Sequence, residues 1–117
     1  MSQHMDALAL ANETRLRQVH LRRQLRELTA SGGLELLADM MAAPDDHLDE
    51  PLGSLRLIDA VRAVRGIGPA RADEIIDRSS PHPPNGLRRV RDLTERERRL
   101  VAGALRRRAM DWHQEAA

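Results

Sequence analysis

The sequence predicts an all-α fold, a small helical body preceded by one long N-terminal helix. Its 117 residues include one Trp and no Tyr or Phe, so the core has to be built from aliphatic side chains and Met. Such a core suits small helix-packed folds better than a sheet sandwich. Apolar residues recur at the three- and four-residue intervals of amphipathic helices, and no stretch alternates with period two for long enough to indicate a strand.

The long helix is expected from about Asp6 to Thr29. One of its faces is apolar and should dock on the body; its leucines are Leu21, Leu25 and Leu28. Roughly the opposite face carries an arginine stripe, which consists of Arg15, Arg22 and Arg26. If the leucine face docks on the body, the arginine stripe stays in solvent. Alternatively, the leucine face could form a seam between two copies of the chain.

Short helices and turns are expected through the middle of the chain. Ser31-Gly32-Gly33 should end the long helix, and a short amphipathic helix should follow from Leu34 to Ala42. The segment from Pro44 to Pro51 is predicted to be a solvated acidic loop or an electrostatic shield that tunes self-association, with a loosely bound cation as the alternative. The next helix is predicted from Leu55 to Val64.

The second half of the body starts with a break in the helical pattern. Gly66-Ile67-Gly68 interrupts it, and the stretch from Pro69 to Asp77 suits a helix with proline in its first turn. Residues 79–86 contain three prolines and can only form a loop. Thr94 and Glu97 then form a capping-box signature for the last helix.

This pattern divides the chain into three segments. Residues 1–30 form the N-terminal helix, which is partly flexible, and residues 31–108 form the compact domain. Residues 109–117 form a C-terminal tail that should fray. Trp112 in this tail should cap an exposed apolar edge or be disordered, and stacking on a binding partner is the alternative.

The composition argues against several classes of function. With no Cys, disulfides, thiol catalysis and cysteine zinc sites are all excluded. The five His show no metal-ligand spacing, and Asp73 and Asp77 are expected to be solvated helix surface rather than a shared metal site. No stretch approaches the roughly 20 apolar residues of a membrane span, and the N-terminus has no apolar signal segment. We therefore expect a cytoplasmic protein that is not an enzyme and needs neither cofactor nor metal.

Charge is distributed unevenly, although the formal net charge is only +1. Residues 15–26 hold five Arg and no acid, residues 35–50 hold six acids and no base, and residues 86–108 hold nine Arg against three acids. The chain contains no Lys. Either a GC-rich genome produces this bias, or Arg is used because its planar guanidinium binds phosphate in a bidentate manner that Lys cannot match.

The segment around Gly66-Ile67-Gly68 is typical of a helix-hairpin-helix motif. Apolar residues stand at the spacings that pack the two helices together: Val61, Val64, Ile67, Ala72 and Ile75. The glycines permit close approach of the backbone, and Ile67 should point inward. The N–H groups between Gly68 and Arg71 should then form an anion site for a nucleic-acid phosphate, although Pro69 lacks a donor. A hairpin that only packs helices or binds protein is the alternative.

Four stretches extend this pattern along the chain: Ser31-Gly32, Leu55-Arg56-Leu57, Gly66-Ile67-Gly68-Pro69-Ala70-Arg71-Ala72 and Arg88-Arg89-Val90-Arg91-Asp92-Leu93. In order and spacing they resemble the actinobacterial integration host factor family over roughly residues 15–105. The resemblance implies a helix-two-turns-helix core in residues 31–108. It also implies a nucleoid-associated protein that binds double-stranded DNA through the phosphate backbone with little sequence preference, and that bends DNA or alters its topology.

The resemblance assigns DNA contacts to the hairpin and to the downstream arginine cluster: Gly66, Ile67, Gly68, Pro69, Ala70, Arg71, Arg88, Arg89 and Arg91. The stripe on the long helix is a second candidate DNA surface: Arg15, Arg22 and Arg26. Pro69 and Asp92 depart from the family, whose members usually have Lys and Gly there. Because the Asp92 carboxylate could pair with the arginine cluster, these departures predict weaker or more selective binding.

Two other functions remain open at this point. One is an adaptor that uses the hairpin fold for protein contacts, and the other is an RNA- or ribosome-associated binding protein. The expected location is the nucleoid, away from any membrane. A monomer is the expected state, with a dimer as the alternative.

Overall fold

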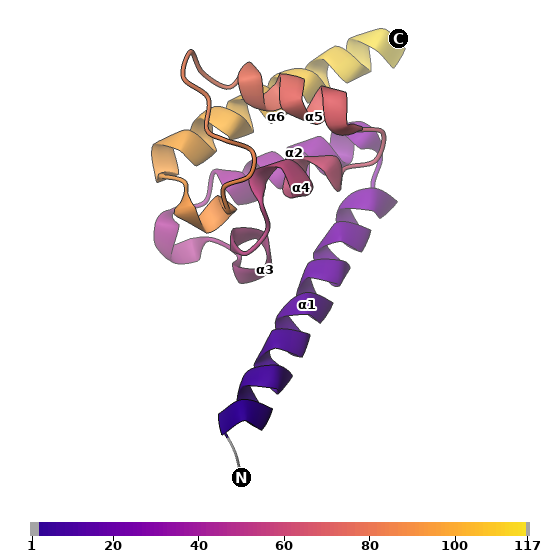
Figure 1. Ribbon diagram of the computed structural model, residues 1–117. Helices are drawn as coiled ribbons and strands as arrows, with labels where there is room; N and C mark the ends of the chain where they lie inside the picture. Colours follow the sequence, from indigo (N-terminus) through magenta and orange to yellow (C-terminus); the bar gives the residue numbers. More distant parts are fainter. Residues whose placement is uncertain (1–2, 117) are drawn as a thin grey trace.

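The computed structural model describes residues 3–116, with side chains for residues 5–112 and 114, and this part consists of helices and loops (Figure 1). The α-helices are α1 (Gln3–Glu27), α2 (Ala30–Met41), α3 (Glu50–Gly53), α4 (Leu57–Arg62), α5 (Pro69–Asp77) and α6 (Glu95–Ala116). The 3-10 turns are η1 (Asp45–His47) and η2 (Val90–Asp92). No strand occurs in the described part, where Arg56 and Arg89 form an isolated bridge. The all-α fold with a long N-terminal helix is confirmed.

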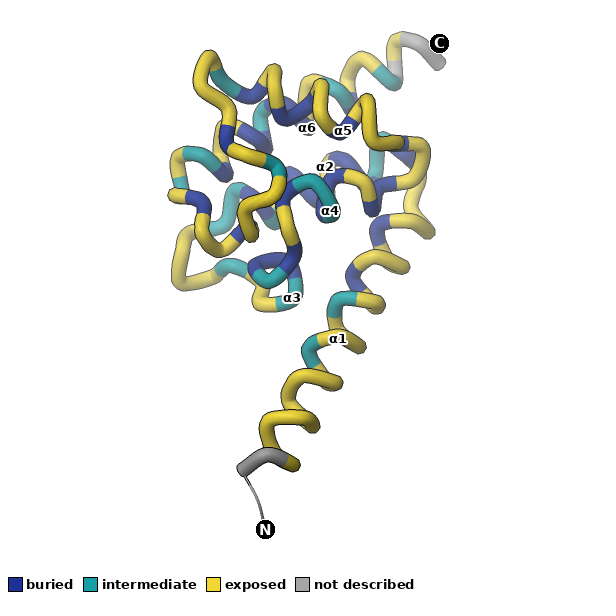
Figure 2. The backbone as a smooth tube through the Cα atoms, in the orientation of Figure 1, coloured by how far each residue is buried: buried dark blue, intermediate teal, exposed yellow. Residues whose placement is uncertain are grey.

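The centre of the body is the pair α2 and α6, which pack against each other over much of their length. The hairpin of α4 and α5 lies on this pair, and α1 leaves the body as an arm (Figure 1). The core is aliphatic, as expected, and includes Leu34, Leu37, Met41, Val101 and Leu105. Figure 2 shows that buried positions concentrate in the body, whereas the outer half of α1 is exposed.

The arm docks on the body through Leu21 and Leu25, which are 5% and 0% exposed. Leu28 is 37% exposed, because α1 ends at Glu27 and the chain leaves the helical face. The predicted docking is therefore right for two leucines and wrong for the third. Because the body itself covers Leu21 and Leu25, this face does not form a seam between two copies.

The glycines after α1 lie inside α2, so the predicted break between the two helices is wrong at this position. Thr29 caps α2, and its Oγ1 accepts a hydrogen bond from Gly32 N at 3.0 Å. A Cβ on Gly33 would lie 3.0 Å from the Leu25 carbonyl oxygen and 3.0 Å from a Val64 methyl carbon. Glycine therefore serves close packing here, because a side chain would push α1 and the end of α4 away from α2.

The acidic segment between α2 and α4 folds into η1 and α3 and is not a plain solvated loop. Asp49 caps α3 by accepting a hydrogen bond from a first-turn backbone N–H at 3.1 Å. Asp45 pairs with Arg98, a fully buried side chain of α6. The Arg98 guanidinium also donates to carbonyl oxygens at the end of α2, at 3.0 Å to Met41 and 2.6 Å to Ala43. A residue that counts as basic surface in the sequence is thus the C-terminal cap of α2.

The capping box at the start of α6 is confirmed. Thr94 N–H donates to Glu97 Oε1 at 2.9 Å, and Glu97 N–H donates to Thr94 Oγ1 at 3.1 Å. The helix does not fray after Arg108 but continues through Trp112, because Ala109 is buried and the Trp112 ring packs on the core. Of the two fates expected for Trp112, capping of an apolar edge is the one observed.

Candidate nucleic-acid interface

The hairpin loop is held between the core and the C-terminal half of α6. Gly66 adopts a φ of 80°, in the left-handed region that suits glycine. Ile67 turns inward and is only 5% exposed, as the sequence predicts. A Cβ on Gly66 would lie 3.0 Å from Cη2 of the Trp112 ring. Gly68 is exposed and forms the N-cap of α5, and a Cβ at this position would meet no atom within 4 Å.

The N-terminus of α5 is open to solvent and has no side-chain cap. The first hydrogen bond of this helix runs from Ala72 N to the Gly68 carbonyl oxygen at 3.0 Å. The N–H groups of Ala70 and Arg71 therefore have no acceptor within the helix. Pro69 contributes no donor. Two outward N–H groups at the positive end of a helix dipole form a place where an anion can bind.

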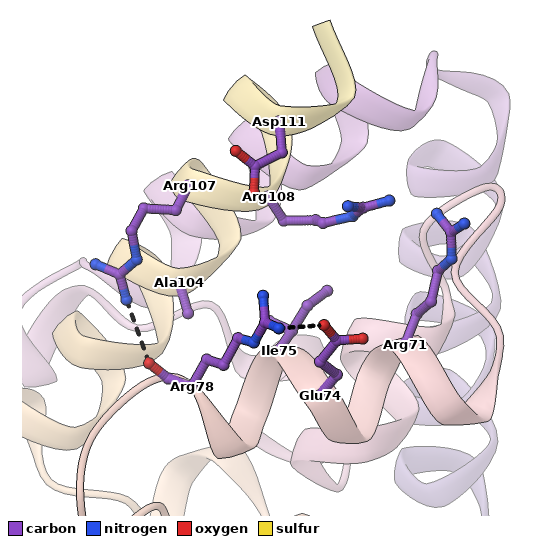
Figure 3. A pocket seen from close by; sticks show the side chains of 8 residues that line it. All are labelled: Arg71, Glu74, Ile75, Arg78, Ala104, Arg107, Arg108 and Asp111. Carbon is purple, nitrogen blue, oxygen red and sulfur yellow. Dashed lines mark hydrogen bonds and ion pairs between the residues drawn. The ribbon is translucent and has the colours of Figure 1, made fainter. Parts of the chain in front are cut away.

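Arg71, in the first turn of α5, is held over an aromatic ring. Its guanidinium carbon lies 5.4 Å from the centre of the Trp112 ring, and that of Arg108 lies 5.3 Å from the same centre. Both distances are within the range of a cation–π interaction. In Figure 3 the two guanidinium groups point toward one another at one end of a cleft between α5 and α6. Trp112 thus supports two cationic groups beside the open end of α5.

The cleft itself has a volume of about 250 Å³. Four of its lining residues are arginines and two are acids; the complete set is Arg71, Glu74, Ile75, Arg78, Ala104, Arg107, Arg108 and Asp111. Glu74 pairs with Arg78 at 2.9 Å, and Arg107 donates to the Arg78 carbonyl oxygen at 3.4 Å (Figure 3). The surplus of positive charge favours an anionic occupant.

On the other side of the hairpin, arginines of α1 meet arginines at the end of α4. Arg22 and Arg26 line adjoining hollows with Arg62 and Arg65, and one of these hollows extends to the Gly66–Gly68 loop. We call these four arginines the basic groove. The arm's stripe is thus divided, because Arg22 and Arg26 line these three hollows and Arg15 does not. Arg62 and Arg65 were not among the predicted site residues, although both directly precede the hairpin loop.

The downstream arginine cluster lies at the opposite end of α4 from the hairpin loop. Leu57 N–H donates to the Arg88 carbonyl oxygen and Val90 N–H to the Leu55 carbonyl oxygen, both at 2.9 Å. This pairing keeps Arg56 extended, so α4 starts later than predicted. It also fixes the cluster beside the start of α4 and leaves Arg91 on the exposed side.

Two members of the cluster are engaged within the protein. Arg88 pairs with Glu97 at 3.3 Å and also donates to the Asp92 carbonyl oxygen, and Arg89 donates to the Ser54 carbonyl oxygen. Among the described residues, the Asp92 carboxylate forms no ion pair, so the expected pairing of this carboxylate with the cluster is wrong. The partner is Glu97, whose pKa is lowered below its ordinary value of 4.5, mainly by the backbone N–H of Thr94 and further by the charge of Arg88.

No group of three or more acidic or His side chains in the described part is arranged to hold a metal ion. Within the same residues, no helix has the length and apolar character needed to cross a bilayer. Comparison with known protein families, with curated proteins and with solved structures gives no match for this chain. The resemblance to the actinobacterial integration host factor therefore stays a prediction from the motifs alone.

Proposed function

We propose that this protein binds double-stranded DNA through the phosphate backbone and acts as a nucleoid-associated protein. The observation that carries the proposal is the convergence of Arg26, Arg62 and Arg65 on the loop that precedes the uncapped end of α5. Guanidinium groups and outward backbone N–H groups are the donors that proteins use for DNA phosphates. Their gathering from α1, α4 and α5 favours one continuous binding surface.

The hairpin loop stands between two sets of cations. The basic groove lies on one side, and Arg71 with Arg108, both supported by Trp112, lie on the other. Such an arrangement suits a polyanion that passes across the loop, because successive phosphates can be met by different donors. We assign the primary contact to this surface and a secondary contact to Arg91 at the far end of α4.

Base recognition is not expected from this surface. The exposed side chains of α5 after Arg71 include Asp73, Glu74 and Asp77, which would be repelled by the phosphates that flank a DNA groove. A helix of this kind is unsuited to insertion between the two strands. Affinity should therefore depend little on DNA sequence.

The proposal is tested by fluorescence anisotropy with a labelled generic duplex of about 20 base pairs at low salt. The variant Arg62→Ala/Arg65→Ala should bind at least about tenfold more weakly than the wild type, because two phosphate contacts are lost. The matched control is Arg96→Ala/Arg99→Ala, which removes the same charge from exposed positions on α6 outside the groove. Equal weakening by both variants would indicate a general charge effect, and no binding by the wild type would contradict DNA binding. Competition with structured RNA tests the alternative ligand.

A further inference from the structure

The arm carries a second apolar face, which is exposed along its length and reaches the edge of the basic groove at Val19. Four large apolar side chains are 49–69% exposed along it: Met5, Leu8, Leu16 and Val19. With Asn12 in the middle, the five residues follow one another at intervals of three, four, four and three, which places them on one side of a helix. Leu21 and Leu25, which dock on the body, lie on roughly the opposite side. We call the five residues the outer stripe.

The outer part of the arm receives no support from the body. Every residue from 5 to 13 is exposed, and partial burial begins at Thr14 and Gln18. Gln18 donates a hydrogen bond to Ser54 Oγ at 2.6 Å and marks the place where α1 meets α3. A few helical turns without tertiary packing are marginal in water. The outer stripe therefore needs a partner if the arm is to be stably helical.

We propose that the partner is a second copy of the same arm, packed antiparallel about a two-fold axis through Asn12. The stripe has mirror-symmetric spacing, so this arrangement sets Met5 against Val19 of the second copy and Leu8 against Leu16 of the second copy. The two Asn12 side chains meet on the axis, where each amide can donate to the other. A surface that complements itself under a two-fold rotation is what an isologous dimer requires.

The charges of the arm also favour an antiparallel second copy. Residues 5–14 contain Asp6 and Glu13 and no Arg, whereas residues 15–26 contain five Arg and no acid. Antiparallel packing lays the acidic half of each arm beside the basic half of the other. Parallel packing would place the two arginine-rich halves side by side, where they repel.

The bodies do not obstruct this pairing. Each body docks on Leu21 and Leu25, roughly opposite the outer stripe, and Val19 at the end of the stripe lines a hollow with Arg65 of the body. The body is attached at the C-terminal half of its own arm (Figure 1). In the antiparallel pair the two bodies therefore lie at opposite ends, with their Arg22 residues about 30 Å apart along the helix axis. The dimer would carry two basic grooves, although its formation does not require DNA.

Sedimentation equilibrium without DNA tests the proposal. The wild type should show a monomer–dimer equilibrium, and Leu8→Gln/Leu16→Gln should raise its dissociation constant at least about tenfold. Leu10→Gln is the matched control, because Leu10 is 64% exposed on the same helix but lies off the stripe, and it should leave the constant unchanged. All of these side chains are exposed, so circular dichroism should show a folded body in each variant. A wild type that stays monomeric at every concentration, or equal weakening by Leu10→Gln, would overturn the proposal.

The orientation is tested by disulfide trapping, because the chain contains no Cys. Asn12→Cys should form a disulfide-linked dimer under mild oxidation, and Met5→Cys alone should not. An equal mixture of Met5→Cys and Val19→Cys chains should give the mixed dimer. Efficient linkage of Met5→Cys to itself would indicate parallel arms and contradict the antiparallel arrangement. Because no step involves DNA, these outcomes are independent of the proposed DNA binding.

Discussion

The two glycines of the hairpin differ in how well their positions could accept a side chain, and the difference can be measured. Gly66 has a positive φ and lies against Trp112, whereas Gly68 has ordinary backbone angles and open space around it. Gly66→Ala should lower the free energy of unfolding by about 1–2 kcal/mol or more, because left-handed backbone is costly for alanine. Gly68→Ala should cost less than about 1 kcal/mol. Urea unfolding of both variants checks the contrast, and equal losses would contradict it.

Glu97 should contribute a pH dependence to stability. The fold lowers its pKa below 4.5, so its carboxylate form is favoured in the folded state. The stability that this provides is present above about pH 4.5 and is lost as the pH falls through the lower folded-state pKa. Glu97→Gln keeps an acceptor for Thr94 N–H but does not titrate there. Urea midpoints measured from about pH 6 to about pH 3 should therefore fall less steeply for Glu97→Gln than for the wild type; identical slopes would contradict this role.

Trp112 should affect DNA affinity without touching DNA, through the two guanidinium groups that it supports. Trp112→Leu removes the ring, so Arg71 and Arg108 lose their fixed positions and binding should weaken several-fold. Trp112→Phe keeps an aromatic face and should retain most of the affinity. Anisotropy titrations on folded variants, with melting temperatures recorded in parallel, separate this effect from a loss of stability. Equal affinity of Trp112→Leu and Trp112→Phe would exclude the supporting role.

At the scale of helices, α2 and α6 are joined by a charged side chain as well as by their apolar contact. Arg98 donates to the Met41 and Ala43 carbonyl oxygens, which lack helical partners at the end of α2. Arg98→Met should destabilise the protein by on the order of 3 kcal/mol, because buried acceptors lose their donor. Asp45→Asn should cost less than about 1 kcal/mol, since that carboxylate is 76% exposed. Thermal unfolding distinguishes the two, and a neutral Arg98→Met would contradict the capping role.

Helix identities could be predicted from local sequence, but some boundaries could not. The capping box at Thr94 and the proline at the start of α5 act within one turn, and both predictions hold. Gly33 misleads because its function is a contact with Val64, which is distant in sequence. The Leu55 carbonyl oxygen accepts a hydrogen bond from the N–H of Val90, which is also distant in sequence, and this bond keeps Leu55 out of α4. Tertiary contacts override local propensity at these positions.

In the candidate site, too, the local patterns could be predicted from the sequence, but their arrangement in the whole molecule could not. The hairpin and the arginine stripe are each visible as patterns, and the inward position of Ile67 follows from its neighbours. The meeting of the stripe with Arg62 and Arg65 depends on the angle at which α1 leaves the body, which no local pattern encodes. Burial of Arg98 is equally invisible in a sequence with 19 arginines. Composition therefore overstates the basic surface and says nothing about where it is continuous.

Binding to the DNA backbone can be measured through the salt dependence of the wild-type affinity for two duplexes of unrelated sequence. Neutralisation of one phosphate by each arginine of the basic groove and by Arg71 and Arg108 predicts a slope of log K against log salt of about −5. We expect the same slope and nearly the same affinity for both duplexes. Absence of binding at the lowest salt, or a slope close to zero, would contradict it.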